Sequence, residues 1–203
     1  MQQRRLLMVI IAGFLIGALG GAAALVVSQG TPGTKVTTTG KALVGGPFAL
    51  VGEGGKTFTD RDFRGRHMLV FFGFTHCPDI CPAELQVMAA SLDELGDKAK
   101  EVVPIFITLD PERDTPEVVV NYVKNFGPEF VGLTGSPEAI AEAAKAYRVA
   151  YSKFTPEGAE AGDNYSIDHT ALVYLMGPDG EFITHIPYGT QAGKMAETLR
   201  RYL

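Results

Sequence analysis

The chain of 203 residues has only two cysteines, no excess of basic residues and no internal repeat. Its formal charge of −5 comes from 23 Asp and Glu against 18 Lys and Arg. A nucleic-acid-binding domain needs a basic face, so this balance argues against nucleic acid as a partner. The part of the chain that follows the N-terminal region is long enough for one domain with a hydrophobic core.

Charge is absent from one long run near the N-terminus. Arg4 and Arg5 precede the uncharged run Leu6–Val27, and the next charged residue is Lys35. At about 1.5 Å per residue, a helix of this length matches the thickness of a bilayer core. A cleaved signal peptide is the alternative, but its apolar region is normally shorter, ~7–15 residues. We therefore expect a transmembrane anchor at 1–28, a linker at 29–42 and a folded domain at 43–203.

The anchor also orients the chain. Arginines precede the run and no charge follows it closely, so the positive-inside rule places the N-terminus in the cytoplasm and the domain outside. We expect a single-pass protein of the inner membrane, with its C-terminal domain in the periplasm, or in the intermembrane space of a mitochondrion. Two cysteines in such a compartment can oxidise, so keeping them reduced requires an external reductant.

The expected elements predict a thioredoxin-like α/β domain. The apolar runs 68–74 and 102–109 are typical of strands buried on both faces. The Gly-Pro-Asp-Gly turn at 177–180 predicts a hairpin over 171–186, and a first hairpin is expected at 48–59. Thr-Pro and Ser-Pro pairs are helix start signals. Helices are expected after the first run, at 116–126, at 137–147 and from about Gln191.

Both cysteines lie where the first buried strand leads into a helix. If Cys77–Cys81 is the first helical turn, both sulfurs share one face, with Cβ atoms about 5–6 Å apart, and the helix N-terminus favours thiolate. A structural disulfide would close a very short loop and restrain the unfolded chain little. A thiol–disulfide oxidoreductase normally uses Cys-x-x-Cys, one residue shorter. Metal ligation is the third interpretation, and a residue far along the chain favours it.

That residue is His169, which lies just before the strand expected at 171–176. In thioredoxins the loop at this position carries a cis-proline over the cysteine pair, and here Asp168 and His169 take its place. Two thiolates and one imidazole suit Cu(I) or Zn(II). Three protein ligands satisfy Cu(I), whereas a structural zinc takes four. Asp168 is a candidate for steering the imidazole or an approaching partner, with capping or turn formation as the alternative.

The other histidines are expected to have lesser roles. His67 and His185 are predicted to be exposed, and His76, next to Cys77, is an auxiliary candidate ligand or a residue that tunes the thiols. The methionines are scattered rather than clustered in a copper-binding motif. The aromatic residues at 71, 72 and 74 are expected in the core.

Three motifs, in this order, resemble the SCO/SenC family: Thr75–Pro82 (THCPDICP), Asp110–Pro116 (DPERDTP) and Tyr165–Thr170 (YSIDHT). The resemblance covers the anchor and the whole domain, and members of this family are membrane-anchored copper proteins with a thioredoxin fold. It implies copper binding by Cys77, Cys81 and His169, as Cu(I) and also as Cu(II). It further implies a role in assembling the binuclear copper centre of cytochrome c oxidase. The implied partners are subunit II of the oxidase or its assembly factors, and a copper donor protein.

We therefore expect a copper metallochaperone rather than an enzyme. The rival is a thiol–disulfide reductase, in which Cys77 and Cys81 form a redox-active disulfide and keep a partner's copper-ligand cysteines reduced. A peroxiredoxin-type peroxidase is disfavoured, because its Thr stands three residues before the cysteine and Thr75 stands two before Cys77. The resemblance does not choose among copper delivery, thiol reduction and redox sensing.

Overall fold

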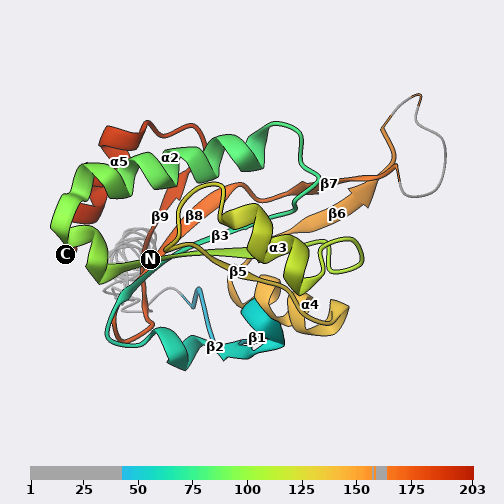
Figure 1. Cartoon of the computed structure of the whole chain (residues 1–203), viewed down its shortest axis with the longest axis horizontal. Coiled ribbons are helices and arrows are strands. Elements are labelled where there is room, and N and C mark those ends of the chain that lie inside the picture. Colours follow the sequence, from blue (N-terminus) through green and yellow to red (C-terminus); the bar gives the residue numbers. More distant parts are fainter. Residues whose placement is uncertain (1–42, 157, 159–163) are drawn as a thin grey trace, which may run out of the picture. The chain divides into compact units, whose positions relative to one another are not determined.

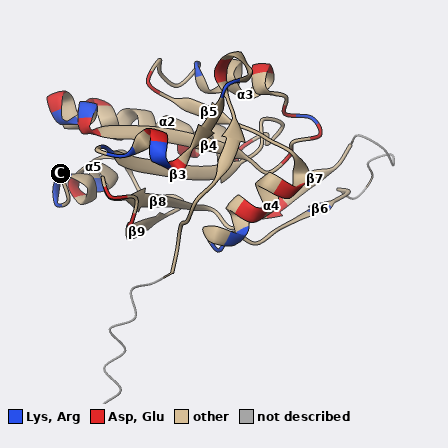
Figure 2. Cartoon of the chain, turned by 90° about the horizontal axis from the view of Figure 1, so that it is seen from below, with Lys and Arg blue, Asp and Glu red and all other residues tan. Residues whose placement is uncertain are grey.

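The centre of the fold is a mixed sheet with the strand order β5-β4-β3-β8-β9 (Figure 1). Its strands are β3 (His67–Gly73), β4 (Val102–Thr108), β5 (Val131–Leu133), β8 (Leu172–Met176) and β9 (Phe182–Pro187). β4 is parallel to β3 and β5, whereas β8 is antiparallel to β3 and β9. These strands contain no Lys, Arg, Asp or Glu, and the charged residues of the described chain lie outside this sheet, mostly on helices and loops (Figure 2). Uncharged strands of this kind can be covered on both faces.

The structure, a computed structural model, describes residues 43–156, 158 and 164–203, all of which belong to one compact unit. The anchor predicted at 1–28 and the linker predicted at 29–42 lie outside the described residues. Within the described ranges, no helix is both long and apolar enough to cross a membrane.

Three of the four α-helices in the described part of the chain begin within one residue of their predicted starts, whereas the helix after the first strand begins at Ile80 rather than at Cys77. The four are α2 (Ile80–Leu95), α3 (Pro116–Val123), α4 (Pro137–Ala146) and α5 (Ala192–Arg200), with short 3-10 helices at η1 (Glu53–Gly55), η2 (Asp60–Phe63) and η3 (Gly96–Glu101). The Thr115 hydroxyl accepts a hydrogen bond from the Val118 N–H at the start of α3. The Ser136 hydroxyl does the same for the Ala139 N–H at the start of α4. Each hydroxyl satisfies a backbone donor that the helix itself leaves unpaired.

Helices cover both faces of the sheet. Phe71 and Phe106 are paired neighbours in β3 and β4, and Phe106 contacts Tyr122 of α3 on one face. Phe72 points to the other face, where its ring centroid lies 5.3 Å from that of Tyr147, directly after α4. Figure 1 shows α5 beside α2. The aromatic residues of β3 are fully buried, as predicted.

Two antiparallel strand pairs accompany the sheet. β1 (Ala49–Val51) pairs with β2 (Thr57–Thr59) and is the predicted first hairpin. β6 (Tyr151–Phe154) pairs with β7 (Ser166–His169), and Figure 1 shows this β6–β7 ribbon extending from one end of the sheet. The sequence did not predict the ribbon, because every residue of β6 is exposed and no hydrophobic pattern marks the strand.

Several expectations need correction. His67 was predicted to be exposed but is only 7% exposed. It is the first residue of β3, the middle strand, whose residues are all buried because strands flank it and helices cover both faces. β5 was not predicted, since it is only three residues long. α3 ends at Val123 rather than at Phe126, and the other predicted helices and the 171–186 hairpin are confirmed.

Candidate metal centre

The two cysteines lie at the junction of β3 and α2, but they do not share one helical turn. α2 begins at Ile80, so Cys77 lies in the preceding loop and Cys81 in the first turn. The Cys81 N–H donates a hydrogen bond to the Cys77 sulfur over 3.4 Å. The Cys77 sulfur is therefore held near Cys81 by a hydrogen bond from the first turn of α2, rather than by helical periodicity. Both are free thiols in the structure.

Gly73 allows Cys81 to approach the sheet closely. A Cβ atom at Gly73, the last residue of β3, would lie only 2.8 Å from the Cys81 sulfur. Since carbon and sulfur do not approach this closely, only glycine leaves space for the sulfur here. Cys81 is consequently fully buried, while Cys77 remains partly accessible.

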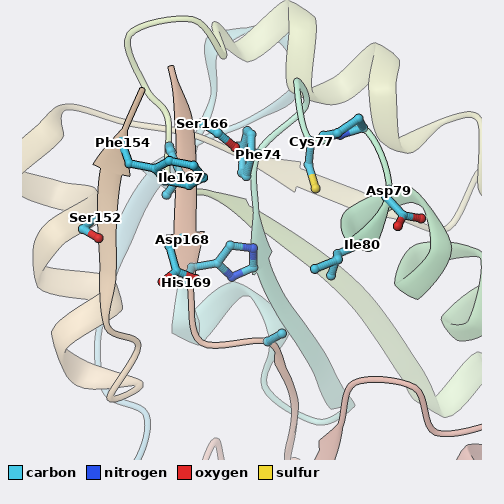
Figure 3. Close-up of a pocket in the computed structure, with 12 residues that line it drawn as sticks. Phe74, Cys77, Asp79, Ile80, Ser152, Phe154, Ser166, Ile167, Asp168 and His169 are labelled. Atoms are coloured by element: carbon cyan, nitrogen blue, oxygen red, sulfur yellow. The ribbon is translucent and has the colours of Figure 1, made fainter. Parts of the chain in front are cut away.

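His169 completes the candidate ligand set from the end of β7 (Figure 3). Its Nε2 lies 3.8 Å from the Cys81 sulfur. Its Nδ1 lies 3.1 Å from the Thr170 carbonyl oxygen, which can only accept a hydrogen bond. The ring proton therefore belongs on Nδ1, and the Nε2 lone pair faces the cysteines. Phe71 and Phe74 contact the ring edge-on and hold its plane.

The two thiols differ sharply in acidity. The pKa of Cys77 is lowered to about 5, mainly because the Cys81 thiol donates a hydrogen bond to the Cys77 sulfur. Hydrogen bonds from the backbone N–H groups of Cys81, Asp79 and Ile80 lower it further, and partial burial opposes them. The same shared proton, together with burial and the negative charge on Cys77, raises the pKa of Cys81 far above its usual value. At neutral pH the pair therefore holds one proton, with Cys77 as the thiolate.

Alkylation tests this assignment. We expect iodoacetamide to modify Cys77 in the reduced chain with a pH midpoint near 5, because a thiolate is the reactive species and Cys77 loses its proton there. In Cys81→Ala the midpoint should move upward, since the thiol that donates to Cys77 is gone. A midpoint in the ordinary thiol range in both proteins would show that the hydrogen bonds do not stabilise the Cys77 thiolate.

A buried carboxylate holds the cysteine loop against the sheet. Asp114 is fully buried, and it accepts hydrogen bonds from the Thr75 N–H at 2.9 Å, from the Thr75 hydroxyl and from the Thr108 hydroxyl. Thr75 stands two residues before Cys77, and Thr108 ends β4. Asp114 thus fixes the path of the chain from β3 into the cysteine loop.

A second buried carboxylate holds the strand that carries His169. Asp110 accepts hydrogen bonds from Arg113 and from the Tyr165 hydroxyl, the latter at 2.6 Å. The Arg113 guanidinium stacks 3.7 Å from the Tyr165 ring centroid and donates to the Tyr165 carbonyl. The loop 110–114 therefore joins both ligand-bearing segments. The sequence marked this loop only as part of the family resemblance, and its positioning role was missed.

Removing the charge of Asp114 tests how much its buried hydrogen bonds stabilise the folded chain. We expect Asp114→Asn to lower the free energy of unfolding by about 2–3 kcal/mol, because buried donors lose a charged acceptor. Urea unfolding followed by circular dichroism measures the change. The control is Asp97→Asn, whose side chain is 97% exposed, and which should change stability by less than about 0.5 kcal/mol. Equal effects in the two variants would contradict a structural role for Asp114.

The remaining predicted residues lie as follows. Asp168 is exposed, and the hydrogen bond of the His169 ring goes to the Thr170 carbonyl, so the structure offers no contact by which Asp168 steers the ring. Its role toward an approaching partner stays a prediction. His185 is exposed, as predicted. His76 is exposed, with Nδ1 3.7 Å from an Asp114 oxygen, and it points toward that carboxylate rather than to the cysteine pair.

His76 also forms a possible cation cluster with Asp110 and Asp114, whose ligand atoms lie within 4.8 Å of one another. Both carboxylates, however, already accept hydrogen bonds from the buried network described above. The three residues lie together because the loop is anchored there, and the cysteine and His169 group remains the better candidate for a soft metal.

A groove opens beside the candidate ligands (Figure 3). Its volume is about 530 Å³, and one wall is formed by the loop and helix start at 77–80, the other by the β6–β7 ribbon. Cys77 and His169 both line it. Molecules from outside can therefore reach Cys77 and His169 through this groove, while Cys81 lies buried behind it. The structure also lacks a cis peptide bond among its described residues, so no thioredoxin-like cis-proline covers the pair.

Comparisons with known proteins identify the family to which the chain belongs. The SCO1/SenC family model matches residues 36–203. The human mitochondrial SCO1 homolog is 44% identical over 166 residues, which cover 81% of this chain and 54% of that protein. The chain thus spans about half the length of the curated mitochondrial relatives it matches.

Solved structures show the same fold. A crystal structure of Arabidopsis thaliana ScoI with copper bound has a TM-score of 0.72 and 41% identity, over 78% of this chain and 97% of that one. Bradyrhizobium japonicum ScoI with copper bound has a TM-score of 0.71 and 42% identity, over 79% and 99%. The fold is therefore the thioredoxin-like α/β fold of these proteins, and the chain belongs to the SCO1/SenC family.

Proposed function

We propose that this chain binds one Cu(I) ion through Cys77, Cys81 and His169, and that it helps assemble the binuclear copper centre of cytochrome c oxidase. The observation that carries the proposal is the approach of the His169 Nε2 to the Cys81 sulfur, at 3.8 Å, with the ring proton held on the other nitrogen. The copper-bound relatives, at 41% and 42% identity, support the choice of metal.

Part of the spacing already suits an ion. The Cys81 sulfur and the His169 Nε2 lie 3.8 Å apart, a gap that two metal–ligand bonds of about 2.0–2.3 Å can span. The ligand atoms of Cys77, Cys81 and His169 do not all lie within 4.8 Å of one another, so the Cys77 side chain would have to move toward the ion to become the third ligand. Two soft thiolates favour Cu(I), and the imidazole allows Cu(II) to be held as well. Copper is the cargo here, and the chain acts as a metallochaperone rather than an enzyme.

The chain would act from a membrane. Residues 1–28 anchor it in the inner membrane, and the domain faces the periplasm, or the intermembrane space in a mitochondrion. Its partners are then a copper donor protein, and subunit II of the oxidase or the assembly factors of that subunit. Access to the ligands through the open groove supports transfer between proteins, because a partner can reach Cys77 and His169 directly.

Copper stoichiometry tests the proposal. We expect the reduced chain to bind one Cu(I) and the oxidised chain to bind none, because a Cys77–Cys81 disulfide consumes both thiolate ligands. Protein-bound copper is measured after gel filtration, with free thiols counted in parallel. Equal copper content in the two forms would exclude the cysteine pair as the copper site.

A thiol–disulfide reductase remains the second candidate, and a specific observation favours it. The low pKa of Cys77, about 5, makes this partly accessible sulfur a nucleophile at neutral pH. The buried Cys81 thiol would then act as the resolving partner. Such an enzyme needs the cysteine pair but not His169, and this difference separates the two candidates.

A further inference from the structure

The groove beside the candidate ligands is acidic. Among the described residues that line it, Asp79 and Asp168 carry charge, one on each wall, and no Lys or Arg lines it. Lys153 lies between two lining residues of β6, but its ammonium lies 2.7 Å from a Glu112 oxygen and over the Tyr165 ring. It is therefore held away from the groove, and the two carboxylates are not neutralised across it.

Large apolar side chains are exposed on the same two walls. Ile80 at the start of α2 is 39% exposed, and Phe154 at the end of β6 is 47% exposed. Both line the groove, together with the more buried Phe74 and Ile167. Apolar side chains exposed together beside a reactive site are typical of a surface that a partner covers.

The backbone favours an extended occupant. β6 and β7 form a two-stranded sheet in the described part of the chain, so each has an edge without a neighbouring strand. Figure 3 shows β7 between β6 and the cysteine loop, so the unpaired edge of β7 is the one on the side of that loop. An extended polypeptide can add to such an edge through main-chain hydrogen bonds, while its side chains fill the groove.

We propose that this groove docks an extended segment of a partner polypeptide in which Lys or Arg residues flank an apolar side chain. The basic residues would lie against Asp79 and Asp168, and the apolar side chain would lie between Ile80 and Phe154. The segment would run past Cys77 and His169. The inference deepens the proposed function, since such docking would bring the partner's own copper ligands next to those of this chain.

The test uses the reduced, metal-free, full-length chain in neutral detergent, so that its outcome does not depend on copper binding. The probes are dye-labelled synthetic peptides with a central leucine and no cysteine. One carries lysines around the leucine, and its counterpart carries glutamates in the same positions. Fluorescence anisotropy measures the dissociation constant of each. We expect the lysine peptide to bind more tightly, and added salt to remove the difference.

Matched charge variants then locate the binding surface. We expect the double variant Asp79→Asn, Asp168→Asn to weaken binding of the lysine peptide about fivefold, the sum of two exposed ion pairs. The control, Asp97→Asn with Glu142→Gln, removes the same charge from exposed positions on η3 and α4, and should leave binding unchanged. Phe154→Ser should weaken binding without changing the preference for lysine.

Two outcomes would overturn the inference. Equal affinity for the lysine and glutamate peptides would exclude an acidic docking groove. Equal weakening by the groove variant and the control variant would show only general attraction to an acidic domain. Copper stoichiometry, measured separately, reports on the proposed function, so the failure of one idea is distinguishable from the failure of the other.

Discussion

His169→Ala is expected to weaken Cu(I) binding by more than about 100-fold while leaving disulfide exchange largely intact. Loss of a residue that only supports a metal ligand already costs about 10–100-fold in affinity, and loss of a ligand should cost more. The thiol chemistry needs only the cysteine pair, whose acidity is set mainly by the Cys77–Cys81 hydrogen bonds. Competition with a Cu(I) chelator measures affinity, and reduction of a model disulfide measures exchange.

The control variants change a histidine away from the site and each of the two cysteines. His185→Ala removes an exposed histidine of β9 and should change neither activity. Cys77→Ser and Cys81→Ser should abolish both. In cells whose oxidase depends on this chain, His169→Ala should prevent oxidase assembly, with partial rescue by added copper. If those cells assemble oxidase normally while either cysteine variant does not, the reductase replaces the chaperone as the function.

Copper affinity should rise about tenfold for each pH unit between pH 7 and pH 9, or about 100-fold across that range. The lowered pKa of Cys77, about 5, means that this sulfur has already lost its proton at pH 7. The raised pKa of Cys81 means that this sulfur still carries one throughout the range. Cu(I) must therefore displace one proton, and a higher pH makes that displacement easier.

The number of protons released gives an independent measurement of the same effect. Titrating the reduced chain with Cu(I) in weakly buffered solution at pH 7.5 should release about one proton per ion bound. Release of two protons, with an affinity that rises about 100-fold per pH unit, would mean that Cys77 is an ordinary thiol before copper binds.

Much of the fold follows from local patterns in the sequence. The runs that form β3 and β4 are continuous and apolar, so they identify strands covered on both faces without knowledge of the rest of the chain. The Thr115-Pro116 and Ser136-Pro137 pairs mark helix starts, because a hydroxyl and a proline suit the unpaired donors of a first turn. Each of these signals acts over only a few residues.

Local patterns do not predict the structure where segments far apart in the sequence determine it. β6 has no buried residue, and its pairing with β7 depends on a partner strand beyond residue 164. His67 looks like a polar residue at a strand end, yet it is buried because the strand becomes the middle of the sheet. Burial of this kind is a property of the assembled layers and not of the neighbouring sequence.

Local sequence and tertiary structure also determine different features of the candidate site. By itself the sequence determined the residue types that can hold a soft metal, namely two cysteines four residues apart and a histidine in a recognisable motif, because ligand chemistry belongs to the side chains. Only the tertiary structure decided that Nε2 rather than Nδ1 of His169 faces Cys81, and that Cys77 rather than Cys81 is the thiolate. The physical reason is that both depend on hydrogen bonds and burial, which exist only once β3, α2 and β7 are held together by the buried Asp110 and Asp114.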